Sequence, residues 1–382
     1  MKPCQSKGPT VVRKLRLLFV NSSTVWGGNE KWTLNAARGL QARGHRVRIA
    51  YRGEAVGERL AQYGFPGEHV SMRSDLDVFS VIRLMRLVRR DKTDVLILTK
   101  HREYWLGGIA GRIAKVPLIF GRLGLVRIPK DTWKNRLIYG GHLLDHLIVN
   151  AAAIKEGLKA CGWIDGKCIH VIYNGIALPK SGDRDGMDVR KEFGIAGRSP
   201  LILGVGRLTK QKGFDFLLQA GRTVIREIPD AKIMIVGTGV EQETLRNQAE
   251  VARIGPNVIF PGLRKDVDVL LKAADVFVLS SRNEGMANVL LEAMALGTPV
   301  ISTRCGGSHE LITHGKNGLL VDFGDVEALS RAIINLLREK ARTSRLEENA
   351  ARFVEDRFSL DQMIDKMEHV LYSKVRLFPD RS

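Results

Sequence analysis

Short apolar runs alternate with longer segments of helical period along almost the whole chain. Apolar runs bounded by glycine, proline or polar residues are typical of buried strands, whereas apolar residues repeated every three to four positions predict amphipathic helices. The alternation predicts an α/β fold in which helices cover both faces of parallel sheets. The predicted strands are 15–20, 47–51, 95–99, 118–120, 147–149, 169–173, 201–205, 232–236, 258–260, 276–280, 299–302 and 319–321, and the helices include 30–42, 77–90, 104–114 and 360–371.

The alternation is interrupted once, between residues 179 and 200, where the chain is polar and rich in glycine, proline and charge. Such a composition is typical of a joint between domains, and 382 residues suit two domains better than one. We therefore expect two doubly wound domains in tandem. The first is expected over residues 1–178 and the second over 195–357, and a C-terminal helix within 358–382 is expected to pack back on the first domain.

Positive charge is concentrated in the first half of the chain. The net charge is +19, and residues 1–180 carry 31 Lys and Arg against 13 Asp and Glu, whereas residues 181–382 carry 29 against 28. A basic half indicates an anionic partner, which could be nucleic acid, an anionic membrane or a phosphorylated substrate. Only 6% of the residues are aromatic and no nucleic-acid-binding module is evident, so a nucleic-acid-binding protein is the less favoured alternative.

The distribution of cysteine and of apolar residues bears on the compartment. The four cysteines show no metal-binding spacing, which is typical of reduced thiols in a cytoplasmic protein. No signal-peptide pattern and no apolar run of membrane-spanning length is present. We therefore expect a cytoplasmic protein.

A glycine-rich basic motif, residues 204–213 (GVGRLTKQKG), follows a predicted strand and opens a predicted helix. Gly206 would let the backbone approach a ligand closely, and a helix N-terminus offers unpaired N–H groups to an anion. Arg207 and Lys212 add two cations at the same place, and together these features suit a diphosphate. The motif is not a P-loop, because the pattern GxxxxGK[ST] does not occur, and it is not a complete dinucleotide fingerprint, because the third glycine is missing.

A second motif, residues 281–300 (SRNEGMANVLLEAMALGTPV), follows the predicted strand 276–280. Ligands of open α/β sheets bind beyond the carboxyl ends of the strands, which is where Glu284 is expected. Gly285 would let a helix start come close to a ligand, and Glu292 would lie one to two turns into that helix. Two carboxylates so placed can accept hydrogen bonds from the hydroxyl groups of a sugar and of a ribose.

These two motifs, with the segment 315–321 (GKNGLLV), resemble the large "group 1" family of retaining GT-B glycosyltransferases, in which the spacing Glu-x7-Glu is the hallmark. The resemblance is dense over residues 200–340. The glycine-rich loop Gly27-Gly28-Asn29-Glu30 and the dipeptide Asn174-Gly175 match the family as well. The resemblance to this family implies a GT-B fold, in which two Rossmann-like domains face a central cleft. It also implies sugar transfer from a nucleotide diphosphate sugar to an acceptor.

The resemblance also implies roles for individual residues. Arg207 and Lys212 would stabilise the diphosphate leaving group, Glu284 would hold the transferred sugar, and Glu292 would bind the ribose, while the donor phosphate would receive the proton of the acceptor. No cofactor and no metal are expected, and Asp75, Asp77, Asp266 and Asp268 are interpreted as helix-start carboxylates. The catalytic candidates are Glu284, Arg207 and Lys212, and the donor-binding candidates are Gly27, Gly28, Gly206, Gly285, Met286, Ala287, Asn288 and Glu292.

The chain departs from the family at one position on the acceptor side. Many relatives have a histidine after the strand that here contains residues 118–120, whereas this chain has Leu123, next to Arg122. His101, at the end of another predicted strand, is a candidate for the missing role. The acceptor-side candidates are therefore Asn29, Glu30, His101 and Arg122.

The basic first domain is expected to bind the acceptor. The segment 78–90 has helical period, with Val78, Val81, Ile82, Met85 and Val88 on one predicted stripe and Arg83, Arg86 and Arg90 on another, and a second basic segment follows at 127–136. We expect peripheral attachment to the inner face of an anionic cytoplasmic membrane and a glycan or lipid-linked acceptor, as in lipopolysaccharide synthesis. Another GT-B activity, such as a sugar-nucleotide epimerase or a phosphorylase, remains the main alternative.

Overall fold

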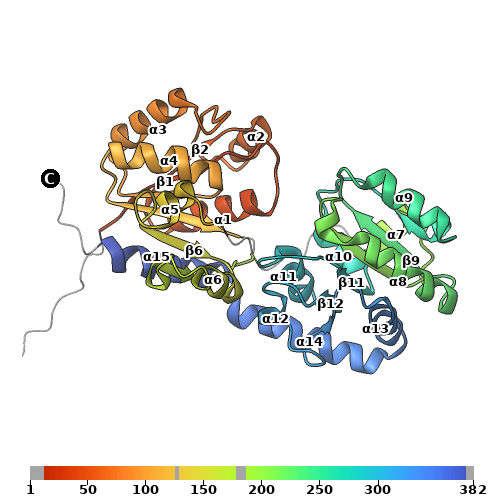
Figure 1. The fold of residues 1–382 in the computed structure, drawn as a ribbon. Coiled ribbons are helices and arrows are strands. Elements are labelled where there is room, and N and C mark those ends of the chain that lie inside the picture. Colours follow the sequence, from red (N-terminus) through yellow and green to blue (C-terminus); the bar gives the residue numbers. More distant parts are fainter. Residues whose placement is uncertain (1–12, 125–128, 178–185, 376–382) are drawn as a thin grey trace, which may run out of the picture. The chain divides into compact units, whose positions relative to one another are not determined.

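The computed structural model describes residues 13–124, 129–177 and 186–375. The chain divides into two compact units, each with its own parallel sheet (Figure 1). Unit 1 comprises Met1–Leu123, Lys130–Ile148 and Met367–Ser382, and unit 2 comprises Gly124–Pro129 and Val149–Lys366.

The first sheet has seven strands in the order β3-β2-β1-β4-β5-β6-β7, and the pairings from β3 to β5 are parallel. The last strand, β7, falls in unit 2. The strands are β1 (Arg16–Asn21), β2 (Arg46–Tyr51), β3 (Gly67–His69), β4 (Val95–Leu98), β5 (Leu118–Leu123), β6 (His146–Val149) and β7 (Ile169–Val171). The helices are α1 (Gly28–Ala42), α2 (Glu54–Gln62), α3 (Val78–Arg90), α4 (His101–Ile113), α5 (Trp133–Tyr139) and α6 (Ala152–Lys159).

The second sheet has six parallel strands in the order β10-β9-β8-β11-β12-β13. Its strands are β8 (Leu201–Val205), β9 (Lys232–Val236), β10 (Val258–Ile259), β11 (Val276–Leu279), β12 (Val300–Thr303) and β13 (Leu319–Val321). Its helices are α7 (Gly186–Glu192), α8 (Phe214–Glu227), α9 (Gln242–Val251), α10 (Val267–Ala273), α11 (Asn288–Ala295), α12 (Ser308–Leu311), α13 (Val326–Arg338), α14 (Lys340–Arg357) and α15 (Leu360–Val375), the last of which continues into unit 1.

The second sheet separates two hydrophobic clusters, one on each face. Along β8, Leu201 and Leu203 belong to one cluster and Ile202 to the other, and the residues of β9 and β11 alternate in the same way. Successive strand side chains point to opposite faces, so a strand covered on both sides must be apolar throughout. This requirement explains why the predicted strands appear as uninterrupted apolar runs.

Strand order fixes where a ligand can bind in each unit. In both sheets a central pair of strands, β1 and β4 or β8 and β11, marks the point where the chain changes its direction of winding. Ligands of doubly wound sheets bind beyond the carboxyl ends of the strands at such a point. The loops after β1, β4, β8 and β11 are therefore the places to look for a functional site.

The structure departs from the sequence-based expectation in one segment, and it shows which residues of α3 are buried. Residues 186–192, expected within the interdomain joint, form α7, which buries Val189 and Arg190; Arg190 donates to the carbonyl of Ala273 and to Asp275. The residues 178–185 lie outside the described part of the chain. Helix α3 forms over the predicted segment; its buried residues are Ser80, Leu84, Leu87 and Val88, of which only Val88 belongs to the predicted apolar stripe, and Val78 is 63% exposed.

The end of the chain is anchored to unit 1 by a buried histidine and an arginine. In α15, Glu368 accepts hydrogen bonds from Arg43 (2.6 Å) and lies 2.7 Å from Nε2 of His45, while Nδ1 of His45 accepts from the backbone N–H of Leu15. Burial would raise the pKa of Glu368, but the hydrogen bonds from Arg43 and His45 lower it overall. The contact places the last turns of α15 against α1 and β1.

Candidate functional site

The carboxyl end of β8 carries the first predicted motif. After Gly206 and Arg207 the chain forms a short turn, Lys210–Lys212, and then Gly213, whose φ of +63° favours glycine. A Cβ on Gly213 would lie 2.1 Å from the carbonyl oxygen of Ser280, at the end of β11, and one on Gly206 would lie 3.1 Å from Cε of Lys212. Glycine is thus needed at residue 213 because the two loops touch through their backbones.

Lys212 and Glu284 form an ion pair across the central strands of the second sheet. Nζ of Lys212 donates to Oε1 of Glu284 at 2.6 Å, and Oγ of Ser281 donates to the same oxygen at 2.8 Å. The side chains of Lys212 and Glu284 are only 16% and 9% exposed. The structure therefore brings together a cation and a carboxylate that are 72 residues apart in the sequence. Ser281 was not predicted, although it directly follows the strand.

Arg207 and Glu292 belong to the same two motifs as the ion pair. The side chain of Arg207 is exposed, and among the residues that the structure describes it forms no ion pair. Glu292 is half-buried in the second turn of α11. An exposed arginine directly after Gly206 is available to an anionic ligand at this edge of the sheet.

The segment 285–288 is engaged with the protein itself. A Cβ on Gly285 would lie 2.2 Å from the carbonyl oxygen of Gly124, so the space that glycine leaves is taken by backbone. Met286 and Ala287 are buried in the hydrophobic core, at 5% and 7% exposure. Nδ2 of Asn174 donates to Oδ1 of Asn288 at 2.7 Å and to the carbonyl of Met286 at 3.3 Å. Met286 and Ala287 can therefore serve a ligand only through their backbone.

A glycine pair that the sequence analysis did not select supports the Glu284 loop. The N–H of Gly307 donates to the carbonyl of Gly285 at 2.8 Å. Gly306 has a φ of +49°, and a Cβ there would lie 1.5 Å from the carbonyl oxygen of Glu284. The loop after β12 is thus packed directly beneath the loop after β11. Two consecutive glycines after a predicted strand were the available signal.

Unit 1 holds a buried polar cluster at the carboxyl ends of β1, β4 and β5. Glu30, in the first turn of α1, is 5% exposed and lies 3.2 Å from Nζ of Lys100, which also donates to Oγ of Ser23. Burial would raise the pKa of Glu30, but the charge of Lys100 and the hydrogen bonds from Ser23 and Lys100 lower it overall. Gly27 and Gly28, at the start of α1, are exposed. Lys100 was not predicted, although it joins Glu30 to the end of β4.

Arg122 completes this cluster from β5. It is 4% exposed, donates to Oδ1 of Asn29 at 2.5 Å and stacks over the ring of Trp32 at 4.1 Å. Asn29 in turn donates to Oγ1 of Thr99 at 3.1 Å. Burial lowers the pKa of Arg122 to about 10, so the guanidinium keeps its charge at neutral pH. Three of the four predicted acceptor-side residues, Asn29, Glu30 and Arg122, therefore lie together.

His101 stands apart from the cluster. Its ring is exposed and Nε2 lies 3.1 Å from Oδ1 of Asn135, at the start of α5. Among the described residues, no direct hydrogen bond or ring contact links His101 to Glu30, Asn29 or Arg122. The neighbouring residue, Lys100, occupies the position that reaches the cluster.

Glu103 ties the loops after β1 and β4 together. It is fully buried and accepts hydrogen bonds from the backbone N–H groups of Ser22, Thr99 and Lys100, the last at 2.9 Å. Burial raises the pKa of Glu103 to about 7, although these hydrogen bonds favour the ionised form. The loops that carry the cluster are therefore held by a carboxyl group that titrates near neutral pH.

The aspartates of the two Asp-x-Asp strings lie near the starts of α3 and α10. Asp77 is the N-cap of α3 and accepts from the N–H of Ser80 at 3.0 Å, and Asp268 lies in the first turn of α10, which confirms both as helix-start carboxylates. Asp266 pairs with Arg264 and Asp75 with Lys134. Within the described residues, no group of three or more His, Cys, Asp and Glu side chains could hold a metal ion, and no helix is long and apolar enough to cross a membrane.

The fold is that of the GT-B glycosyltransferases. The structure matches that of HepE from Anabaena in complex with UDP and glucose with a TM-score of 0.85, at 23% identity, over 94% of this chain and all of that one. In sequence, the chain is 30% identical to the lipopolysaccharide core biosynthesis glycosyltransferase LpsE of Rhizobium meliloti over 77% of this chain and 80% of that protein.

Sequence comparison also defines the family. Residues 187–353 match the family "Glycosyl transferases group 1" and residues 26–179 match "Glycosyltransferase Family 4". A further relative, at 27% identity over 78% of this chain and 80% of its own length, is the UDP-Gal:alpha-D-GlcNAc-diphosphoundecaprenol alpha-1,3-galactosyltransferase of Escherichia coli. The chain belongs to the group 1 glycosyl transferases, and the protein is a glycosyltransferase.

Proposed function

We propose that this glycosyltransferase moves a hexose or related sugar from a nucleoside diphosphate sugar to a lipid-linked or lipopolysaccharide-type acceptor, with retention of anomeric configuration. The observation that carries the donor side is the Lys212–Glu284 ion pair, which lies at the switch point of the second sheet with the exposed Arg207 close by in sequence. Relatives named for lipopolysaccharide core synthesis and for transfer to a diphosphoundecaprenol acceptor support the acceptor class.

On the donor side, the leaving group is a nucleoside diphosphate, so catalysis depends mainly on stabilising the charge that develops on it. Arg207 and Lys212 would supply this stabilisation. Lys212 is already oriented by Glu284, and its remaining N–H donors can face a phosphate oxygen. Glu284 would bind hydroxyl groups of the transferred sugar through its second carboxylate oxygen, and Glu292 would bind the ribose.

The proposed reaction needs no metal ion and no enzymic nucleophile. Two cations and a helix N-terminus would neutralise the diphosphate in place of a divalent ion. Retention would follow if the acceptor attacks from the face that the leaving group occupies, with its proton passing to the departing phosphate. The preorganised cations would then stabilise the negative charge of the diphosphate before and after it departs.

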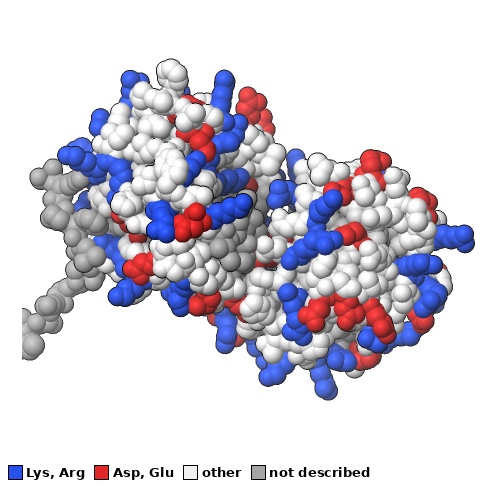
Figure 2. Space-filling model, in the orientation of Figure 1, with Lys and Arg blue, Asp and Glu red and all other residues white. Residues whose placement is uncertain are grey.

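On the acceptor side, we propose the polar cluster around Glu30 and Arg122 as the region that orients the attacking hydroxyl group. Glu30 is held ionised by Lys100 and can accept a hydrogen bond. The excess of positive charge in residues 1–180 supports work at the inner, cytoplasmic face of an anionic membrane. Figure 2 shows Lys and Arg side chains spread over the part of the molecule that contains α3 and α4.

One experiment tests this proposal. The purified protein, dialysed against EDTA, is screened by thermal shift against UDP, GDP, ADP and CMP sugars, and the stabilising donor is then used in a transfer assay whose product is analysed by NMR for its anomeric configuration. We expect stabilisation by one donor, transfer without added metal and retention. Inversion would refute the retaining mechanism, a strict need for Mg²⁺ or Mn²⁺ would refute metal independence, and interconversion of free sugar nucleotides would favour an epimerase.

A further inference from the structure

Three large apolar side chains of unit 1 are exposed close to one another. Leu76 is 86% exposed and Phe79 is 85% exposed, at the start of α3, and Trp133 is 69% exposed, at the start of α5. Single exposed apolar side chains are common, but burying one of this size contributes about 1.5–3 kcal/mol. A group of them on one surface indicates a binding function.

An ion pair holds the two helix starts side by side. Asp75, next to Leu76, pairs with Lys134, next to Trp133, and Nζ of Lys134 lies 4.9 Å from the ring centre of Trp105. The rings of Trp105 and Trp133 are in edge-to-face contact at 6.0 Å between centroids. Leu76 and Trp133 are therefore each one residue away from the same ion pair.

The loop that carries Leu76 has an ordered conformation that leaves the side chain of Leu76 exposed. Asp77 caps α3 and its carboxylate also accepts from the N–H of Arg73 and from Oγ of Ser80, so the chain is closed tightly on both sides of Leu76. Helix α3 packs inward through Leu84, Leu87 and Val88, which leaves Phe79 on the outward side. The exposure of these side chains is thus a consequence of ordered structure.

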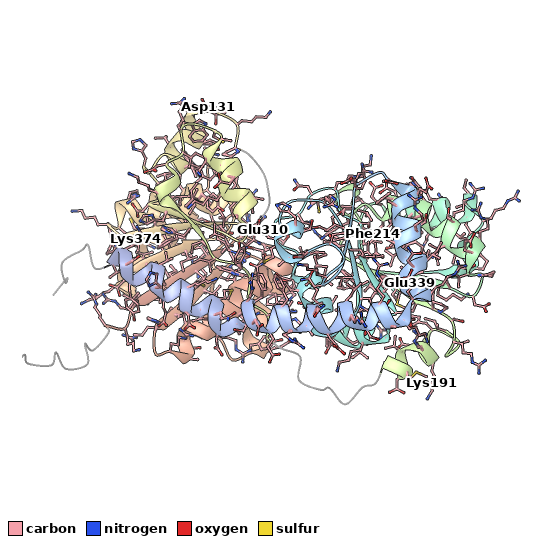
Figure 3. All side chains as sticks on the ribbon, turned by 90° about the horizontal axis from the view of Figure 1, so that it is seen from below. Asp131, Lys191, Phe214, Glu310, Glu339 and Lys374 are labelled. Carbon is pink, nitrogen blue, oxygen red and sulfur yellow. The ribbon has the colours of Figure 1, made fainter. Side chains whose placement is uncertain are left out.

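The two segments that carry the apolar group are rich in cations. Residues 72–90 contain five arginines against two aspartates, and residues 129–137 contain three cations against one aspartate. Arg73, Arg86 and Lys130 form no ion pair with any described carboxylate. Arg83, Arg90 and Arg136 are partly neutralised by Glu68, Asp91 and Asp131. Figure 3 places Asp131, which precedes α5, at the outer edge of this part of the molecule. Arg127 lies outside the described residues.

We infer that Leu76, Phe79 and Trp133 insert into the interface of an anionic lipid bilayer, with Arg73, Arg86 and Lys130 at the level of the lipid headgroups. Exposed apolar side chains and unpaired cations in the same two segments match the two layers of such a surface, acyl chains and anionic headgroups, and tryptophan prefers the boundary between them. The inference deepens the proposed function, since it identifies the surface that would meet a membrane-held acceptor.

Insertion and electrostatic attraction respond differently to salt. Attraction between the cations and anionic lipid is screened, whereas burial of apolar side chains is not. Binding to anionic vesicles should therefore fall with rising salt to a residual level that depends on Leu76 and Phe79. A surface that attaches by charge alone would lose all of its binding.

The test measures co-sedimentation with vesicles of phosphatidylglycerol and phosphatidylcholine, and with phosphatidylcholine alone, in low and high salt and without nucleotide. L76S/F79S should bind anionic vesicles at least about tenfold more weakly than the unmodified protein, because two interfacial side chains are lost. The control V251S/L263S replaces two residues of unit 2 that are 85% and 78% exposed, and should bind normally. Trp133 gives a direct readout: vesicles should shift the tryptophan emission to the blue, and W133F should lose most of this shift.

Three outcomes would overturn the inference: normal vesicle binding by L76S/F79S, an equal loss in the control, or a concentration-dependent dimer that L76S/F79S abolishes without any vesicle binding. The last would assign the surface to a second copy of the chain. Stabilisation by a nucleotide sugar, measured in parallel, should be unchanged in L76S/F79S. If no nucleotide sugar stabilises the unmodified protein, the proposed function is contradicted, but the result on membrane binding remains valid.

Discussion

Replacement of Glu284 by alanine is the most direct test of the donor site. The change removes a carboxylate that accepts from Nζ of Lys212 at 2.6 Å and from Oγ of Ser281 at 2.8 Å. If Glu284 contacts the sugar during transfer, the turnover rate should fall about 10²-fold or more, which corresponds to about 2.7 kcal/mol of transition-state stabilisation. Nucleotide binding should largely survive, because Arg207 and Lys212 remain.

The structure also predicts that Glu284→Ala lowers the stability of the folded protein. Without Glu284, the ammonium group of Lys212 loses a partner in a site where its side chain is 16% exposed. Leaving a polar group unpaired there should cost about 1–3 kcal/mol, reduced by whatever water reaches the lysine. Thermal unfolding of the variant should therefore begin at a lower temperature, and the kinetic assay has to be run well below it.

A double-mutant cycle shows whether Glu284 acts by orienting Lys212 or through its own carboxylate. Turnover and the dissociation constant of the nucleoside diphosphate are measured for Glu284→Ala, Lys212→Met and the double variant, with Glu284→Gln as the isosteric control. If Glu284 acts mainly by orienting Lys212, the double variant should be no worse than Lys212→Met. Near-normal turnover in Glu284→Ala would refute the reasoning altogether.

Other predictions concern the metal, the buried carboxyl group and the supporting glycines. Transfer activity after dialysis against EDTA should be nearly unchanged; recovery only on addition of a divalent ion would contradict the metal-free site. The folded-state pKa of Glu103, about 7, lies above its ordinary value, so the unfolded chain binds fewer protons between those values and stability should fall as the pH rises from about 4.5 to 7. Calorimetry should show this slope in the unmodified protein and its loss in Glu103→Gln; equal slopes would contradict it. Gly306→Ala should reduce stability and activity strongly, because its Cβ would overlap the carbonyl of Glu284, whereas Gly315→Ala, with φ of +75° and open space, should cost only about 1 kcal/mol. Similar unfolding temperatures for the two glycine variants would show that the loop adapts.

The sequence was sufficient for the fold because each central strand is apolar on both faces. Runs such as Val276–Leu279 are buried along their whole length. The strands were predicted from these uninterrupted apolar runs. The helix over residues 78–90 was predicted, but its segment has more apolar residues than one face can bury, and periodicity alone cannot tell which of them face inward. Helix α7 was hidden by the polar, glycine-rich composition of its surroundings.

The sites were predictable only in part, for a different reason. Motifs locate residues that lie close together in the sequence, so Glu284 and Lys212 could each be selected, but their contact could not. Lys100 and Glu103 carry no motif, and their roles depend on Glu30 and Ser22, which are brought near only by the pairing of β1 with β4. Gly285 was expected to make room for a ligand, whereas the structure fills that space with the carbonyl of Gly124.

The backbone contact between Gly213 and Ser280 has a consequence for the order of events during synthesis of the chain. The loop after β8 leaves the ribosome long before β11 has been translated, and it cannot take its final form until Ser280 is available to pack against it. A nascent chain that ends before Glu284 therefore has Lys212 and Arg207 but lacks the assembled donor site that we propose. Nucleotide sugars should accordingly bind only chains in which the second sheet is already assembled, and this makes ligand-dependent protection from proteolysis a measure of completed folding.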